Sequence, residues 1–120
     1  ASPSSLAYCS SKAALAMLTQ CIALDHGADG VRANCVAPGW VRTPMADEEM
    51  DALGLGTREE AYATVTQDVP LRRPSSPEEI AGTVAWLLSS DASYVNGAVL
   101  PVDGGHTMVD LGTLAFGRMA

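Results

Sequence analysis

The chain has 120 residues, and its 14 acidic side chains outnumber 7 basic ones, which gives a net charge of −7. Because nucleic acids and anionic membrane surfaces are bound through clustered Lys and Arg, this charge argues against both as partners. The length suits one domain, the longest apolar run is too short to span a membrane, and no signal peptide is visible. We therefore expect a soluble, cytoplasmic protein.

The first predicted element is a long helix over roughly residues 7–26, which is rich in Ala, Leu and Met. Ser4 and Ser5 are candidate N-caps, and Gly27 is a candidate C′ residue. Apolar residues lie on most sides of this helix, so we expect it to be covered on more than one face, by a sheet and by a second helix or subunit.

A short, buried strand is predicted next, over residues 31–37, and Pro38-Gly39 ends it. Residues 46–53 and 57–67 then predict two short polar helices. The acidic residues of these two helices are typical of a solvated face rather than a ligand site.

A helix start is predicted at Ser76-Pro77-Glu78-Glu79, because Ser76 and Glu79 can form a capping box and Pro77 suits the first helical position. This helix is expected to run to about Ser89, and a second short strand follows over residues 98–102. A strand, a helix and another strand imply a right-handed parallel crossover, so the fold class is α/β. Two strands are too few to cover both faces of a parallel sheet, so further strands are expected on the N-terminal side.

Cysteine and histidine give no metal signal. Cys9, Cys21 and Cys35 are an odd number without a CxxC spacing, which is typical of free, buried thiols in a reducing compartment. His26 and His106 stand alone, outside any HxxxH or HExxH spacing, so we expect no metal site.

Tyr8 and Lys12 are spaced i and i+4 in the first predicted helix, and Lys12 is the only lysine in the chain. This spacing places both side chains on one helix face. A nearby cation stabilises phenolate, so it lowers the pKa of a tyrosine from about 10 and suits the phenol to proton exchange with a carbonyl or alcohol oxygen. A surface aromatic–lysine pair is the alternative for these two residues taken alone.

In this context the sequence resembles the short-chain dehydrogenase/reductase family. The matching pieces are Tyr8-x-x-x-Lys12, Asn34-x-Val36-x-Pro38-Gly39 with Thr43, Pro70-Leu71-x-Arg73, Pro77-Glu78-Glu79-Ile80-Ala81, Asn96-Gly97 and Val102-Asp103-Gly104-Gly105. The resemblance implies the C-terminal portion of a doubly wound, Rossmann-like parallel sheet, with two strands, flanking helices and a helical substrate lid over about residues 45–68.

The resemblance also implies an NAD(P)-dependent oxidoreductase that interconverts a secondary alcohol and a ketone. Tyr8 is similar to the family's catalytic acid/base, and Lys12 to the residue that lowers its pKa and hydrogen-bonds the nicotinamide ribose. The loop that holds the nicotinamide end and pyrophosphate of NAD or NADP is matched by Pro38, Gly39, Val41 and Thr43.

Residues of the lid are weaker candidates for contacting substrate. The candidates are Met45, Met50, Leu53 and Tyr62, and simple packing beneath a surface segment is the alternative for each. Trp40 either flanks the nicotinamide or merely packs.

The sequence also departs from the family pattern, since no GxGxxG or TGxxxGxG fingerprint occurs in it. Ser4 and Ser5 also lie too close to Tyr8 to match the family's catalytic Ser. We therefore expect residues 1–120 to be the C-terminal part of a single domain whose dinucleotide-binding half is absent, and the isolated chain to be inactive.

Two other functions stay open. The chain could be a truncated, non-catalytic remnant that acts as an oligomerisation module through the helix at 7–26, or a small α/β binding domain without redox chemistry. For the complete enzyme we expect a small-molecule alcohol or ketone substrate and a homo-oligomer, either a dimer or a homotetramer. The tail from His106 is a candidate contact with a neighbouring subunit.

Overall fold

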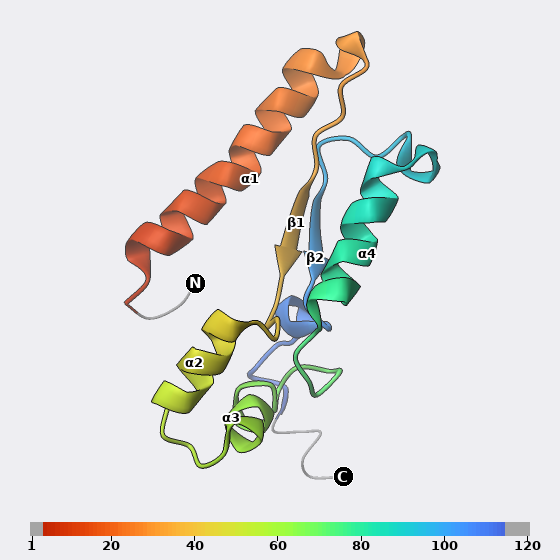
Figure 1. The fold of residues 1–120 in the computed structure, drawn as a ribbon. Helices are drawn as coiled ribbons and strands as arrows, with labels where there is room; N and C mark the ends of the chain where they lie inside the picture. The colour runs from red at the N-terminus through yellow and green to blue at the C-terminus, as the bar shows by residue number, and fades with distance from the viewer. Residues whose placement is uncertain (1–3, 115–120) are drawn as a thin grey trace. The chain divides into compact units, whose positions relative to one another are not determined.

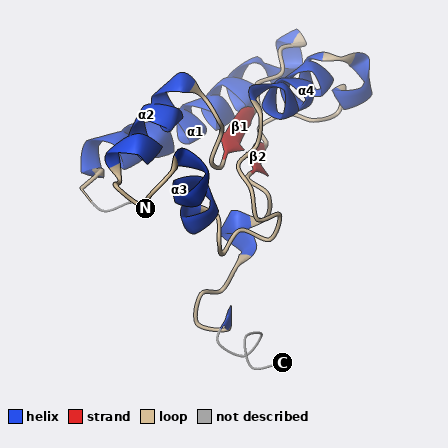
Figure 2. Cartoon of the chain, turned by 60° about the horizontal axis from the view of Figure 1, so that its bottom comes forward, coloured by secondary structure: helices blue, strands red, loops and turns tan. Residues whose placement is uncertain are grey.

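The structure, a computed structural model, describes residues 4–114. Its elements confirm the α/β class (Figure 1). In chain order they are α1 (Leu6–His26), η1 (Gly27–Asp29), β1 (Cys35–Pro38), α2 (Pro44–Ala52), α3 (Arg58–Val65), α4 (Pro77–Leu88), η2 (Ser90–Ala92), β2 (Val99–Val102) and η3 (His106–Met108). Helices dominate, and the two strands are short (Figure 2).

The chain divides into two compact units, which are described separately. The first contains the residues up to Ala37 and Thr83–Leu100, and the second contains Pro38–Gly82 and the residues from Pro101 on. β1 and β2 form a two-stranded parallel sheet, and the boundary between the units passes through both strands. The end of the tail, residues 115–120, lies outside the described residues.

In the first unit, α1 ends as predicted at His26, but the predicted C′ role of Gly27 is wrong. Gly27 keeps a right-handed conformation and begins η1, so the chain continues for one more turn. The left-handed residue is Gly30, whose φ is 81°. Glycine suits this position because it has no Cβ to clash there.

The apolar residues of α1 are mostly exposed. Ala23 is the only residue of this helix that the described part of the chain buries. Leu15, Met17 and Leu18 are all exposed, so the cover expected over more than one helix face does not come from residues 4–114.

β1 is shorter than the predicted strand at 31–37 and is half-buried rather than buried. Residues 32 and 33, which come just before β1, form hydrogen bonds outside the sheet. The Ala33 N–H donates to Asn96 Oδ1 at 3.0 Å, and the Arg32 guanidinium donates to three carbonyl oxygens.

Two asparagines fix the pairing of β1 with the segment before β2. Asn34 donates from Nδ2 to the Val95 carbonyl at 2.9 Å and accepts the Ala98 N–H at 3.0 Å. Asn96 donates from Nδ2 to the Ala23 carbonyl of α1 at 3.0 Å. Amide side chains therefore satisfy several main-chain groups of the first unit.

The core of the second unit lies between α2 and α3, close to the two helices predicted at 46–53 and 57–67. Its buried residues are Ala46, Met50, Ala61 and Tyr62, with Trp40 and Val65 packed against them. Each helix begins at a threonine N-cap, Thr43 for α2 and Thr57 for α3. The predicted capping box of α4 is confirmed, since the Ser76 N–H donates to Glu79 Oε2 at 2.9 Å and the Glu79 N–H donates to Ser76 Oγ at 3.4 Å.

All three cysteines are unpaired, but the prediction that they are buried is wrong. Cys21 on α1 is exposed, whereas Cys9 on the same helix and Cys35 in β1 are half-buried.

Within residues 4–114, no helix has both the length and the apolar character needed to cross a membrane. The same residues contain no cluster of three or more His, Cys, Asp or Glu side chains that could hold a metal ion.

Candidate active site

The first turns of α1 bring Tyr8 and Lys12 together, as the i, i+4 spacing predicts. The Lys12 Nζ lies 5.4 Å from the centroid of the Tyr8 ring. Tyr8 is 64% exposed, so its phenol is open to a ligand. The pair places the side-chain amino group of Lys12 near a phenol ring whose hydroxyl can give or take a proton.

The second unit contains the predicted cofactor loop as one turn, residues 38–43. The Gly39 N–H donates to the Val102 carbonyl at 3.1 Å, and a Cβ on Gly39 would lie only 2.9 Å from the Asp103 Cα. Only glycine therefore fits there without moving the backbone. Val41 forms an isolated parallel bridge with Ser75, which holds the other side of the turn.

Thr43 ends this turn and begins α2. Its Oγ1 accepts the Ala46 N–H at 3.2 Å, and Pro44 occupies the first turn of the helix. A hydroxyl that accepts one hydrogen bond still has its own proton to donate. Because the positive end of the helix dipole lies at the same place, Thr43 is suited to donate to an anionic oxygen.

The four lid candidates fall into two groups. Met50 and Tyr62 are buried in the α2–α3 core, which favours the packing alternative for both. Met45 and Leu53 are exposed. Leu53 lines a hollow of about 320 Å³ together with Trp40 and Met50, so Leu53 is the lid candidate with both exposure and a cavity beside it. Trp40 packs against the core and lines this hollow.

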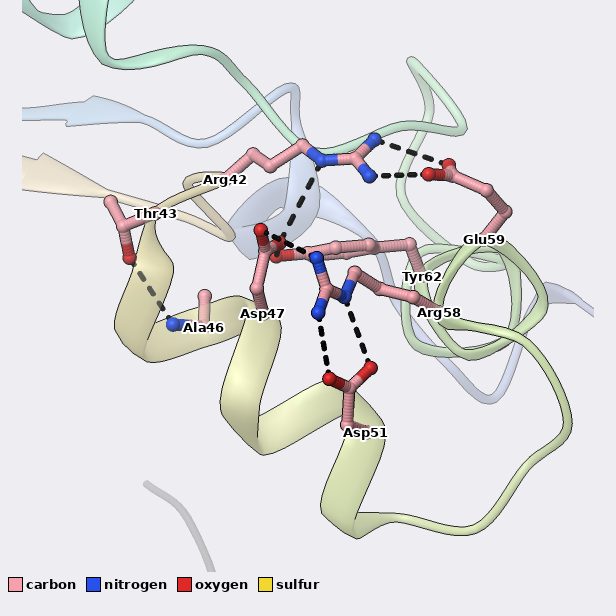
Figure 3. Close-up of polar contacts among 8 residues, drawn as sticks. All are labelled: Arg42, Thr43, Ala46, Asp47, Asp51, Arg58, Glu59 and Tyr62. Carbon is pink, nitrogen blue, oxygen red and sulfur yellow. Dashed lines mark hydrogen bonds and ion pairs between the residues drawn. The ribbon is translucent and has the colours of Figure 1, made fainter.

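The acidic residues of the lid helices include members of an ion-pair network, which the interpretation as a solvated face did not anticipate (Figure 3). The Tyr62 hydroxyl donates to Asp47 Oδ1 at 2.9 Å, and the Arg42 guanidinium carbon lies 5.1 Å from the centroid of the Tyr62 ring. Arg42 also forms a two-pronged pair with Glu59. The one clue to this network in the sequence is that Arg42 and Arg58 stand close to several acidic residues.

The network sets the charge states of its members. Burial, and then the hydrogen bond to Asp47, raises the pKa of Tyr62 to about 12. The hydrogen bond from Arg42 lowers the pKa of Glu59. In the same way, the bond from Arg58 lowers the pKa of Asp51. At neutral pH the carboxylates of Glu59 and Asp51 are therefore ionised while Tyr62 is a neutral hydrogen-bond donor.

Comparisons with known proteins identify the family of the chain. A family model described as "Enoyl-(Acyl carrier protein) reductase" matches residues 1–107. The structure of a short chain dehydrogenase family protein from Francisella tularensis has a TM-score of 0.84 and 37% sequence identity, and the match covers 91% of this chain and 46% of that one. The chain belongs to the short-chain dehydrogenase/reductase family.

This short-chain dehydrogenase/reductase also has close relatives in sequence. Protein MoaE of Klebsiella aerogenes is 52% identical over 120 residues, which are 97% of this chain and 46% of that protein. Meso-2,3-butanediol dehydrogenase of Serratia marcescens is 44% identical over 103 residues, which are 86% of this chain and 38% of that protein. The short-chain dehydrogenase/reductase chain therefore spans less than half the length of these two relatives.

Proposed function

We propose that residues 1–120 are the C-terminal part of an NAD(P)-dependent oxidoreductase that interconverts a secondary alcohol and a ketone. The observation that carries the proposal is the Tyr8–Lys12 pair, with the ammonium 5.4 Å from the ring centroid and the phenol exposed. Family membership and dehydrogenase relatives support the same activity.

In this proposal Tyr8 gives a proton to the carbonyl oxygen in reduction and takes it from the alcohol in oxidation. Lys12 stabilises the phenolate form and offers ammonium protons to a ribose hydroxyl. When bound, NAD(P) supplies or accepts the hydride.

Two features of the turn at 38–43 support the cofactor part of this proposal. Gly39 keeps the turn free of a side chain, and Thr43 retains a hydroxyl proton for a phosphate or carboxamide oxygen. Pro38 and Val41 are proposed as the other cofactor contacts of this turn. Because the sequence contains no Gly-rich phosphate loop, we propose that this loop belongs to a segment outside residues 1–120 and that these residues alone do not turn over substrate.

We further propose that the working enzyme is cytoplasmic, uses residues 45–68 as its substrate lid and assembles as a dimer or tetramer. A second function, a non-catalytic oligomerisation module, is favoured by one observation, the exposed apolar residues of α1.

The test uses the full-length product of the gene that encodes this chain, assayed with NAD⁺ or NADP⁺ and a panel of secondary alcohols. Tyr8→Phe is expected to lower kcat by at least about 100-fold, because it removes the proton-transfer group. Tyr94→Phe is the matched control, since Tyr94 is fully exposed elsewhere in the first unit and should leave kcat unchanged.

Equal activity of the Tyr8→Phe variant and the wild type would refute the assigned role. A full-length product that forms stable oligomers but turns over none of the alcohols with either cofactor would support the oligomerisation module instead.

A further inference from the structure

Arg42 occupies an unusual place, because it lies inside the proposed cofactor turn and contacts both lid helices. In sequence it stands between Val41 and Thr43. Its guanidinium forms a two-pronged pair with Glu59 of α3, and its Nε lies 3.7 Å from Asp47 Oδ1 of α2 (Figure 3). One side chain therefore joins three segments of the second unit.

Arg58 completes the connection between the two helices. It donates to both oxygens of Asp51 of α2, at 3.0 Å and 2.7 Å, and to Asp47 Oδ2 at 3.1 Å. Asp47 thus lies between two guanidinium groups and also accepts the hydroxyl of Tyr62 (Figure 3).

Isolated surface ion pairs contribute little to stability, because solvent screens them and ordering long side chains costs entropy. This network differs in geometry. The Arg42–Glu59 and Arg58–Asp51 pairs are two-pronged. The Asp47 side chain, which both arginines share, is 23% exposed. The Arg42 guanidinium also lies over the ring of Tyr62, which is 2% exposed and cannot move independently of the core. Asp47 and Tyr62 are therefore held in place before any ligand arrives, and Arg42 connects them to Glu59, whose side chain is 70% exposed.

We propose that Arg42 is a positioning residue that fixes α2 and α3 to the turn at 38–43, so that the helical lid is ordered before substrate binds. The lid and the turn then move as one body, and loss of Arg42 weakens substrate binding more than it slows the chemical step. The kinetic part rests on the proposed function, whereas the ordering of the lid does not.

The first experiment measures amide hydrogen exchange of the full-length product without cofactor or substrate. In Arg42→Gln, the amides of α2 and α3 are expected to exchange about tenfold faster than in the wild type, because the segment opens more often. The matched control is Arg73→Gln, which breaks the equally two-pronged Arg73–Glu79 pair in the same unit and should leave α2 and α3 unchanged.

Two further variants test whether Arg42 slows amide exchange by pairing with Glu59. Arg42→Gln with Glu59→Gln should exchange no faster than Arg42→Gln alone, because the pair is already broken. Arg42→Lys keeps the charge but not the two-pronged geometry, so it should fall between wild type and Arg42→Gln. The proposal is overturned if the amides of α2 and α3 already exchange freely in the wild type. It is also overturned if Arg42→Gln and Arg73→Gln accelerate the exchange of these amides equally.

The second experiment compares steady-state kinetics of the same variants. Arg42→Gln is expected to raise KM for the alcohol by about three- to tenfold while kcat stays within about twofold, which is the pattern of lost ground-state binding. A lower kcat with unchanged KM would contradict the positioning role. If the wild type shows no turnover, the proposed activity fails, and the exchange experiment still decides whether Arg42 orders the lid.

Discussion

Replacing Tyr62 with Phe removes a single hydroxyl from the core of the second unit. Tyr62 is 2% exposed, and its hydroxyl donates to Asp47 Oδ1 at 2.9 Å. A hydrogen bond to a charged group contributes about 1.5–3 kcal/mol. Because the Asp47 side chain is 23% exposed, water can partly replace the lost donor. We therefore expect Tyr62→Phe to lower the free energy of unfolding by about 1.5 kcal/mol at pH 8.

The same residue predicts how this difference changes in alkali. The pKa of Tyr62 is raised to about 12 in the folded chain, whereas an unfolded tyrosine titrates near its ordinary value of 10.0. A raised pKa leaves the stabilisation complete below the unfolded pKa and removes it as the pH rises through the folded pKa. The advantage of wild type over Tyr62→Phe should therefore be constant up to about pH 10 and shrink between pH 10 and about 12.

Urea denaturation followed by Trp40 fluorescence measures this difference, with the other tryptophans of the full-length product replaced by Phe. Trp40 packs against the α2–α3 core and so reports on the second unit. All other titrating groups are common to the two proteins, so their effects cancel in the difference. Equal stability at pH 8, or a gap that stays constant from pH 8 to pH 12, would refute the reasoning.

The remaining predictions concern backbone contacts. In a urea titration, Gly39→Ala should lower the free energy of unfolding of the second unit by about 1–3 kcal/mol, because the new Cβ would lie 2.9 Å from the Asp103 backbone. The control is Gly82→Ala in α4, which has open space around it and should leave the free energy of unfolding unchanged or raise it. Asn34→Asp should lower the thermal unfolding temperature of the first unit, because it keeps the acceptor for Ala98 but sets a carboxylate against the Val95 carbonyl. An unchanged transition would show that the amide of Asn34 does not fix the sheet register.

Features that depend on neighbours within one or two helical turns could be predicted from the sequence. The Ser76 and Glu79 capping box spans three residues, and the α4 start is where the sequence predicts it. The i, i+4 spacing of Tyr8 and Lys12 likewise sets their meeting on α1, because helix geometry alone fixes it. The two lid helices were also predictable as helices, but the ion pairs formed by their acidic residues were not.

Contacts between groups far apart in the sequence could not be predicted, because they depend on the packing of whole segments. Arg42 finds Glu59 across 17 residues, and Asn34 finds the Val95 carbonyl across 61. A distant contact also explains why β1 begins at Cys35 and not at residue 31 as predicted, since Asn96 accepts the Ala33 N–H. Periodicity and capping describe local main-chain bonding, whereas these contacts depend on how segments pack, which no short stretch of sequence contains.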